Sequence, residues 1–200
     1  MHLKLQTAIV AALIAVGSMA IGQETPAETS VQEDAQVDLG LDLGEPEGPA
    51  VGQPYILQEF GDWAMRCVKA PEGQRDPCNL YQLLFDAEDN AIAEVNFFRL
   101  PEGGQAAAGA NIIVPLETLL IEGLILSVDG ANPRSYPFRF CNAGGCVARL
   151  GFTQEDVDGF KRGASAQVRV VPAAAPDQEI LLNLSLTGFT AGYEGVVTSE

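Results

Sequence analysis

Four cysteines in two close pairs are the residues of this chain whose chemistry is easiest to define. The pairs are Cys67 with Cys78 and Cys141 with Cys146. Three connectivities are possible, but each close pair encloses turn-forming residues, 71–73 and 76–77 in the first and 142–145 in the second. Strands flanking such turns can return side by side. We therefore expect two local disulfides, each restricting the unfolded chain by roughly 2–3 kcal/mol.

Thiol redox chemistry and zinc binding are the alternatives for these cysteines. Redox sites use a Cys-x-x-Cys at a helix start, whereas four residues separate Cys141 from Cys146 and no helix is expected there. The only histidine is His2, in a segment expected to be removed, so a zinc site would need four reduced thiolates. Structural disulfides are the favoured interpretation.

Carboxylates offer the remaining routes to chemistry. Without a histidine base, a serine or cysteine nucleophile is not activated in the usual way, and Gly-x-Ser-x-Gly is absent. A glycosidase needs only two acids, but candidates such as Asp62 and Glu94 cannot be paired from their spacing. Residues 86–90 could bind calcium, although they also suit a polar hairpin turn. We predict no catalytic residue, no metal site and no cofactor.

The amino terminus indicates export. His2 and Lys4 precede an apolar run from Leu5 to Val16, and Ser18-Met19-Ala20 is a small-x-small cleavage pattern. The run is shorter than the roughly 20 residues of a membrane span. We predict a signal peptide at 1–20 and a protein that is periplasmic, outer-membrane-associated or secreted, with no transmembrane span in its mature form.

Residues 21–52 form an acidic segment that precedes the domain. They contain eight acidic residues and no basic residue, with prolines and glycines between them. So little apolar surface cannot offset the entropy of ordering, which predicts a disordered linker. The alternative is a docking arm for a basic partner, with the apolar residues of 37–44 as anchors.

The rest of the chain is predicted to be one mainly β domain, 53–197. Nine apolar or alternating segments are bounded by turn residues: 63–68, 79–85, 91–100, 108–114, 124–128, 136–140, 146–152, 166–171 and 180–186. One short helix is expected at 154–161, with Thr153 as N-cap and Gly163 at its end. This pattern favours a single β-sandwich.

The charge of the chain argues against nucleic acid as a partner. From residue 53 onward there are 19 acidic and ten basic residues, and no basic run is longer than Lys161-Arg162. Phosphate neutralisation by lysine and arginine supplies most nucleic-acid affinity, and such residues are too sparse here.

Several of these residues together resemble the invasion associated locus B family of exported bacterial proteins. The resemblance rests on Gly61-Asp62-Trp63 before Cys67 and Cys78, on Cys141 with Gly145-Cys146, and on 184–192, which includes Gly188-Phe189. It implies a sandwich-like domain in the periplasm or outer envelope, two disulfides, and a name taken from host-cell invasion. It implies no reaction.

Trp63 and Phe189 also have roles that follow from their chemistry. We expect Trp63 to anchor the core beside the first disulfide, because burying the indole ring removes a large apolar area from water. Residues 188–192 are expected to form a strand end and a tight bend, with Phe189 in the core. Exposed ligand or partner platforms are the alternatives for both rings.

Two functional hypotheses follow. The favoured one is a non-catalytic binding or structural protein of the envelope, which contacts a protein or envelope component through a sheet edge or loops and aids host-cell interaction or envelope integrity. The alternative is a carboxylate-dependent hydrolase acting on envelope glycans, which requires two acids in one groove.

Overall fold

The computed structural model describes residue 44 and residues 48–197. The predicted signal peptide, 1–20, and nearly all of the predicted acidic linker, 21–52, lie outside the described residues, so the proposed domain boundaries stay predictions. Within the described part, no helix is long and apolar enough to cross a membrane.

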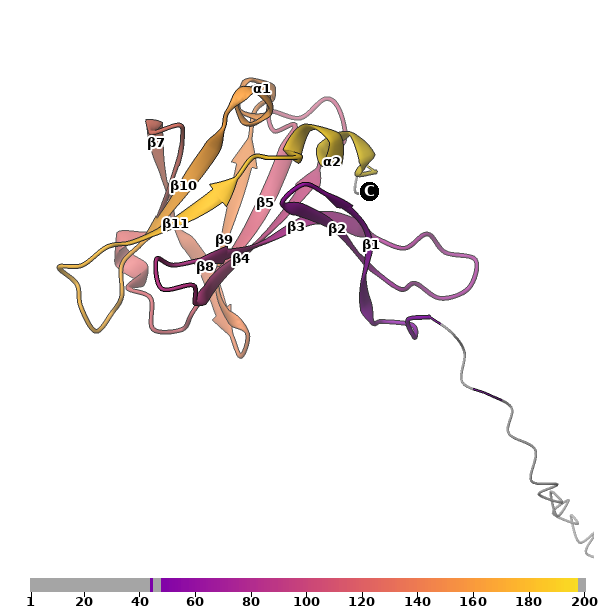
Figure 1. Ribbon diagram of the computed structural model, residues 1–200, viewed down its shortest axis with the longest axis horizontal. Coiled ribbons are helices and arrows are strands. Elements are labelled where there is room, and N and C mark those ends of the chain that lie inside the picture. Colours follow the sequence, from indigo (N-terminus) through magenta and orange to yellow (C-terminus); the bar gives the residue numbers. More distant parts are fainter. Residues whose placement is uncertain (1–43, 45–47, 198–200) are drawn as a thin grey trace, which may run out of the picture. The chain divides into compact units, whose positions relative to one another are not determined.

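Eleven strands form two antiparallel sheets (Figure 1). The larger sheet has the order β1 (Pro54–Phe60), β2 (Trp63–Val68), β3 (Cys78–Phe85), β4 (Ala91–Arg99), β5 (Ala108–Val114), β9 (Gly145–Phe152) and β8 (Phe138–Asn142). The smaller has the order β11 (Ile180–Ser185), β10 (Ser165–Val170), β6 (Leu124–Val128) and β7 (Ala131–Tyr136).

The expected β-sandwich with two local disulfides is confirmed, and the structure adds elements to it. Disulfides join Cys67 to Cys78 across β2 and β3, and Cys141 to Cys146 across β8 and β9. The added strands are β1 and β7. Neither shows alternating burial, because each is paired on one side only and is largely exposed, so periodicity could not predict them.

Helix α1 (Gln154–Arg162) forms where its capping residues predict it. The Thr153 hydroxyl accepts a hydrogen bond from the Asp156 amide at 3.3 Å, and the Asp156 carboxylate accepts one from the Thr153 amide at 2.9 Å. This reciprocal arrangement satisfies amides that the first turn leaves without helical partners. Val157 and Phe160 are buried against the sheets.

A second helix, α2 (Phe189–Gly195), corrects one sequence expectation. Residues 188–192 were expected to form a strand end and a tight bend, but the left-handed Gly188 is the N-cap of a helix. Thr190 and two glycines have low helix propensity, which hides the helix from sequence analysis. Burial of Phe189 and Tyr193 stabilises it instead.

Aromatic rings fill the core where the two helices meet the large sheet. Phe97 packs edge-to-face on Trp63, Phe160 and Phe189, with centroids 6.5, 5.7 and 5.0 Å away, and stacks on Phe152 at 5.2 Å. Trp63 is 1% exposed. Such pairs contribute about 0.5–1.5 kcal/mol each beyond the area that they bury, so this cluster holds both helices on the sheet.

We predict that Gly188→Ala severely destabilises the protein. Gly188 has a φ of +85°, and a Cβ there would lie 1.9 Å from the Phe60 carbonyl oxygen. We expect the free energy of unfolding, measured by urea denaturation, to fall by about 4 kcal/mol or more.

Gly73→Ala is the matched control. Gly73 has a φ of +82° with nothing within 4 Å of the added Cβ. The free energy of unfolding of this variant should therefore fall only by the strain of a left-handed backbone, about 1–2 kcal/mol. Equal losses for the two variants would show that close packing at Gly188 is unimportant.

Candidate functional site

The Gly61-Asp62-Trp63 motif and the motif at 184–192 meet at one hydrogen-bonded junction. The Asp62 amide donates to the Thr187 carbonyl at 3.1 Å, and the Trp63 indole N–H donates to the Ser185 carbonyl at 2.8 Å. The Ser185 hydroxyl donates to the Asp62 carboxylate. We call this cluster, with Gln82, the junction; it joins β2 of the large sheet to the end of β11.

Gln82 completes the junction, and sequence analysis missed it. Its side-chain amide donates to the Ser185 carbonyl at 3.1 Å, and its amide oxygen accepts from the Ser185 N–H at 2.8 Å. Gln82 is buried between Leu80 and Leu84 on the inward face of β3. A polar side chain at an inward position of an alternating strand was the available signal, because a buried amide needs partners.

The junction also explains the motif glycines. A Cβ on Gly61, whose φ is +59°, would lie 2.7 Å from the Thr187 carbonyl oxygen. A Cβ on Gly188 would lie 1.9 Å from the Phe60 carbonyl oxygen. The two backbones therefore pass within a distance that only glycine allows, and this contact fixes where α2 begins.

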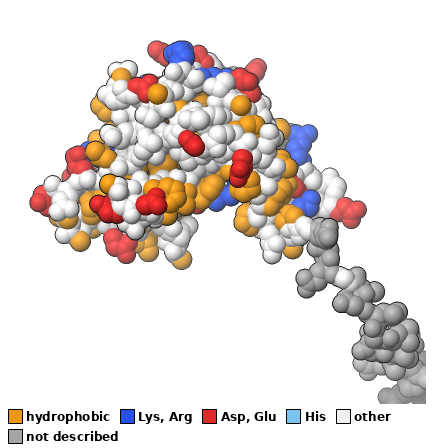
Figure 2. All heavy atoms as spheres, viewed as in Figure 1, with side chains coloured by type: hydrophobic (Ala, Val, Ile, Leu, Met, Phe, Trp, Pro, Cys, Tyr) orange, Lys and Arg blue, Asp and Glu red, His pale blue; other side chains and the backbone are white. Residues whose placement is uncertain are grey.

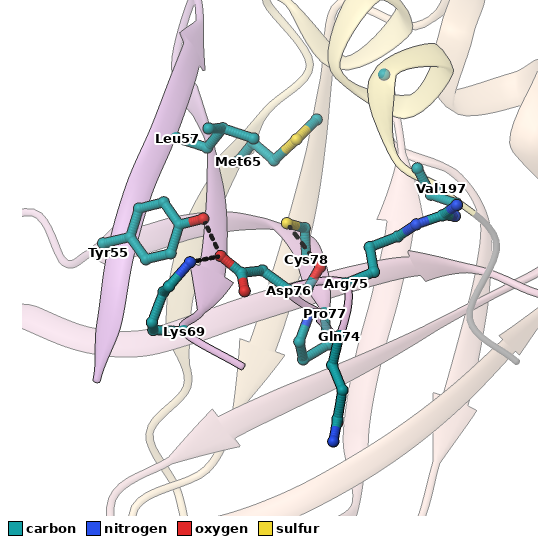
Figure 3. A pocket seen from close by; sticks show the side chains of 11 residues that line it. Tyr55, Leu57, Met65, Lys69, Gln74, Arg75, Asp76, Pro77, Cys78 and Val197 are labelled. Carbon is teal, nitrogen blue, oxygen red and sulfur yellow. Dashed lines mark hydrogen bonds and ion pairs between the residues drawn. The ribbon is translucent and has the colours of Figure 1, made fainter. Parts of the chain in front are cut away.

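Below α2, a groove of about 810 Å³ opens beside β1 and β2 (Figure 3). Its apolar side is formed by Leu57, Met65 and Val197, and its polar side by Tyr55, Lys69 and the disulfide-closed loop. The lining residues of that loop are Gln74, Arg75, Asp76, Pro77 and Cys78. The groove thus depends on both α2 and the first disulfide.

Asp76 joins the two ends of this loop to each other and links the loop to Tyr55 of β1. Its carboxylate accepts hydrogen bonds from the Tyr55 hydroxyl at 2.6 Å, the Ala70 amide at 2.8 Å and the Lys69 ammonium at 3.4 Å. These hydrogen bonds hold the pKa of Asp76 below its ordinary value, and the bond from Tyr55 contributes most. The hydrogen bond between the two side chains also raises the pKa of Tyr55. Asp76 therefore holds the loop in place as an ionised carboxylate.

Strand β1 forms the open rim of the groove. It pairs only with β2, so within the described residues its outer edge has no strand partner. Ile56 is 48% exposed and Leu57 57% exposed, and the register with β2 shifts between Ile56 and Gln58. Natural edge strands usually carry charges or prolines that prevent pairing. β1 begins with Pro54 and carries Glu59 as its one charged side chain, so residues 55–58 between them form an uncharged stretch of the edge.

The second disulfide lies at the opposite edge of the large sheet. Cys141 and Cys146 close the β8–β9 hairpin, where Gly145 has a φ of +134° and approaches the Val114 carbonyl. A Cβ there would lie 2.4 Å from that oxygen. Gly145, Cys141 and Cys146 therefore lie at the opposite edge of the sheet from the groove.

The acids considered for other chemistry have structural partners. Asp86 accepts hydrogen bonds from the Glu88 and Asn90 amides, which makes 86–90 a hairpin turn. Glu94 forms an ion pair with Arg66 at 3.4 Å. Within residues 48–197, no group of three or more His, Cys, Asp or Glu side chains is placed to hold a metal.

The groove also lacks the paired carboxylates that glycoside hydrolysis requires. Among its lining residues Asp76 is the single acid, and its oxygens already accept three hydrogen bonds. A smaller hollow beside α1 contains Glu155 and Asp156. There, Asp156 caps the helix and pairs with Arg134 at 2.8 Å. No observation in the described residues favours the hydrolase hypothesis.

Comparison with known proteins points to one family. Residues 63–197 match the family model described as "Invasion associated locus B (IalB) protein". Two proteins named invasion protein B homolog, from Brucella abortus strain 2308 and from Brucella abortus biovar 1 strain 9-941, are each 24% identical over 147 residues, covering 72% of this chain and 81% of the relative.

A crystal structure of invasion associated protein B from Bartonella henselae has a similar fold. Its TM-score is 0.55 at 20% sequence identity, and the match covers 67% of this chain and 89% of that one. At this identity the likeness supports the fold alone.

We predict that Asp76→Asn lowers stability at neutral pH. Because the folded pKa of Asp76 is lowered, its stabilising contribution is complete above the unfolded value of about 3.9 and disappears as pH falls through the folded pKa. The difference in unfolding free energy between wild type and variant should be largest near pH 7 and should shrink in acid, as measured by urea titrations across pH.

Glu72→Gln, in the same loop, serves as the control. Glu72 is exposed and no hydrogen bond or ion pair is described for it, so this variant should follow the wild-type pH dependence. If the difference in unfolding free energy between wild type and Asp76→Asn stayed constant with pH, the ionised carboxylate of Asp76 would not be what stabilises the loop.

Proposed function

The chain belongs to the invasion associated locus B family, and from that premise we propose that it is an exported, non-catalytic binding protein. We propose further that it binds an extended segment of a partner protein along β1. Its place of action is the periplasm, the outer envelope or the exterior of the cell. There it serves host-cell interaction or envelope integrity.

The open edge of β1 is the observation that carries this proposal. An extended segment can add to a sheet edge through main-chain hydrogen bonds, while its alternate side chains enter neighbouring pockets. Here the edge is seven residues long, and the groove with its apolar side lies directly beside it. Ile56 and Leu57 would lose exposed apolar area on binding, which favours association.

The charges around the groove favour a segment that carries an acidic residue. Arg75 lines the groove, is exposed and has no ion pair among the described residues, and Lys69 is partly exposed beside it. The chain has a net charge of −16, and acidic side chains are scattered over the face that Figure 2 shows, so two cations at one groove are an uncommon local feature. Complementary charge steers association and fixes register more than it adds affinity.

Export is supported by the disulfides as well as by the predicted signal peptide. Disulfides persist in oxidising compartments, and all four cysteines are paired. A bound partner segment would therefore meet the protein outside the reducing cytoplasm.

We predict that Leu57→Glu weakens binding by roughly 10–100-fold, because it removes one apolar side chain from the interface. The probe is a synthetic heptapeptide selected from a random display library against wild-type protein, with its Kd measured by calorimetry. The peptides selected should alternate apolar side chains and include an acid.

Leu181→Glu is the matched control. Leu181 is 50% exposed, similar to Leu57, but lies on β11 of the smaller sheet. It should leave the Kd unchanged, and both variants should keep wild-type stability within about 0.5 kcal/mol. Equal losses of affinity in the two variants would refute binding at β1.

The acidic segment 21–52 is the competing location for the partner site. A version lacking these residues should bind the same peptide with the same Kd. Loss of binding in the shortened protein would transfer the site to that segment.

A further inference from the structure

A hollow of about 240 Å³ lies between α1 and the hairpin formed by β6 and β7 (Figure 1). It shares no lining residue with the groove beside β1. Its apolar lining includes Leu126, Tyr136, Phe152 and Phe160, all buried or half-buried. We call this space the α1 hollow. Its volume equals that of about eight molecules of liquid water, so a ligand of roughly 10–15 non-hydrogen atoms would fill it.

Gly159, in the middle of α1, leaves this space open. A glycine inside a helix is less stabilising than an alanine. A Cβ added at Gly159 would have no atom within 4 Å, so packing does not require a glycine there. Because Gly159 lines the α1 hollow, an alanine would place its methyl group in that space. The glycine therefore lowers helix stability and keeps room for another molecule.

Two side chains of opposite charge flank Gly159 on the helix. Glu155 lies four residues before it and Arg162 three residues after it, which places all three on one side of α1. Glu155 and Arg162 both line the α1 hollow and are exposed, and no ion pair or side-chain hydrogen bond is described for either within residues 48–197. Helical side chains lean toward the N-terminus, so Arg162 leans over Gly159.

One ion pair at the α1 hollow is already complete. Arg134 of β7 pairs in register with the buried Leu126, so its side chain points to the inner face of the sheet. There its guanidinium donates to the Asp156 carboxylate at 2.8 Å. Asp156 also accepts from the Thr153 amide in the capping box. A ligand would therefore bind to Glu155 and Arg162.

We propose that the α1 hollow binds a free dipeptide with an apolar side chain. The peptide ammonium would donate to the Glu155 carboxylate, and the peptide carboxylate would accept from the Arg162 guanidinium, whose planar fork suits it. Helix geometry places the Cα atoms of these residues about 10 Å apart, and with the lean of Arg162 this suits the roughly 7 Å of two extended residues. The apolar side chain would lie against Phe152 and Phe160.

The balance of charge favours a zwitterion over a simple anion or cation. Two arginines and two acids line the α1 hollow, so the charges of its lining cancel. An acid near the start of a helix and a base near its end also suit the helix dipole. That role would be served equally well with alanine at position 159. The open glycine between the two charges indicates that a molecule lies there. This site is separate from the peptide site proposed at β1.

The test is a titration of 15N-labelled protein with Ala-Leu, followed by NMR. The matched probes are N-acetyl-Ala-Leu, which lacks the ammonium group, Ala-Leu amide, which lacks the carboxylate, and free leucine, whose two charges are too close together to reach both residues. We expect Ala-Leu to shift the backbone amides of 155–162 and 134–136 with a Kd on the order of 1 mM. Each matched probe should bind at least tenfold more weakly.

Two charge variants assign the two ends of the peptide. Arg162→Gln should bind Ala-Leu and its amide equally, because the interaction that distinguishes these probes is gone. By the same reasoning, Glu155→Gln should bind Ala-Leu and its acetylated form equally. Arg139→Gln and Glu72→Gln make the same charge changes at exposed residues outside the α1 hollow, and should keep the wild-type preferences.

Gly159→Ala separates binding from folding. It should raise the urea midpoint, because alanine favours the helix and its Cβ meets no neighbour. It should weaken Ala-Leu binding tenfold or more, because the methyl group occupies the hollow. A residue with a purely structural role would not change stability and binding in opposite directions.

Four results would overturn the proposal. The first is no shift at 155–162 with Ala-Leu up to roughly 10 mM, a concentration that would fill a millimolar site. The second is equal binding of Ala-Leu and any of the matched probes to the wild type. The third is a preference for the free carboxylate that survives Arg162→Gln. The fourth is an unchanged affinity in Gly159→Ala.

Discussion

The two-way hydrogen bond between Gln82 and the Ser185 backbone, joined by the Trp63 indole, is the interaction on which the rest of the domain depends. It buries a side-chain amide between two leucines of β3 and satisfies it with the backbone of the other sheet. A buried amide without these partners would be strongly unfavourable, so only one alignment of β11 against β2 and β3 is acceptable. That alignment brings Gly61 and Gly188 into contact. It thereby fixes the residue at which α2 begins and the position of α2 beside the groove.

Stability and binding use different parts of this arrangement. The junction and the aromatic cluster are buried between the sheets, whereas the peptide site proposed at β1 lies at a free edge and on a disulfide-closed loop. A binding edge needs unpaired main chain and exposed apolar side chains, which reduce solubility in a free protein. The strong net negative charge of the chain disfavours pairing between copies, because like charges repel each other.

Much of the fold could be predicted from the sequence because local signals agreed with the tertiary structure. Alternation in β10 and β11, the Thr153 capping box and the turns between paired cysteines all lead to the observed elements. Strands β1 and β7 could not be predicted, because an edge strand exposed on both faces has no apolar period. Helix α2 was hidden for another reason: packing of Phe189 and Tyr193 overrides its poor helix propensity.

The candidate site was predictable only in part. Asp62, Trp63, Gly188 and Phe189 were recognisable as motif residues, but their meeting through Gln82 depends on pairing between segments about a hundred residues apart. Lys69 and Asp76 lie at the two ends of the loop between β2 and β3, but no sequence spacing shows that Tyr55 of β1 joins them in one hydrogen-bonded cluster. Long-range geometry, and not residue chemistry, was the missing information.

Native-state hydrogen exchange, measured by NMR on the Trp63 indole N–H and the Ser185 amide, tests the central role of the junction most directly. If the junction holds the two sheets together, both protons exchange only through global unfolding. Their exchange free energies then equal the unfolding free energy from urea denaturation. Exchange of either proton at a clearly lower free energy, through local opening, would contradict this account.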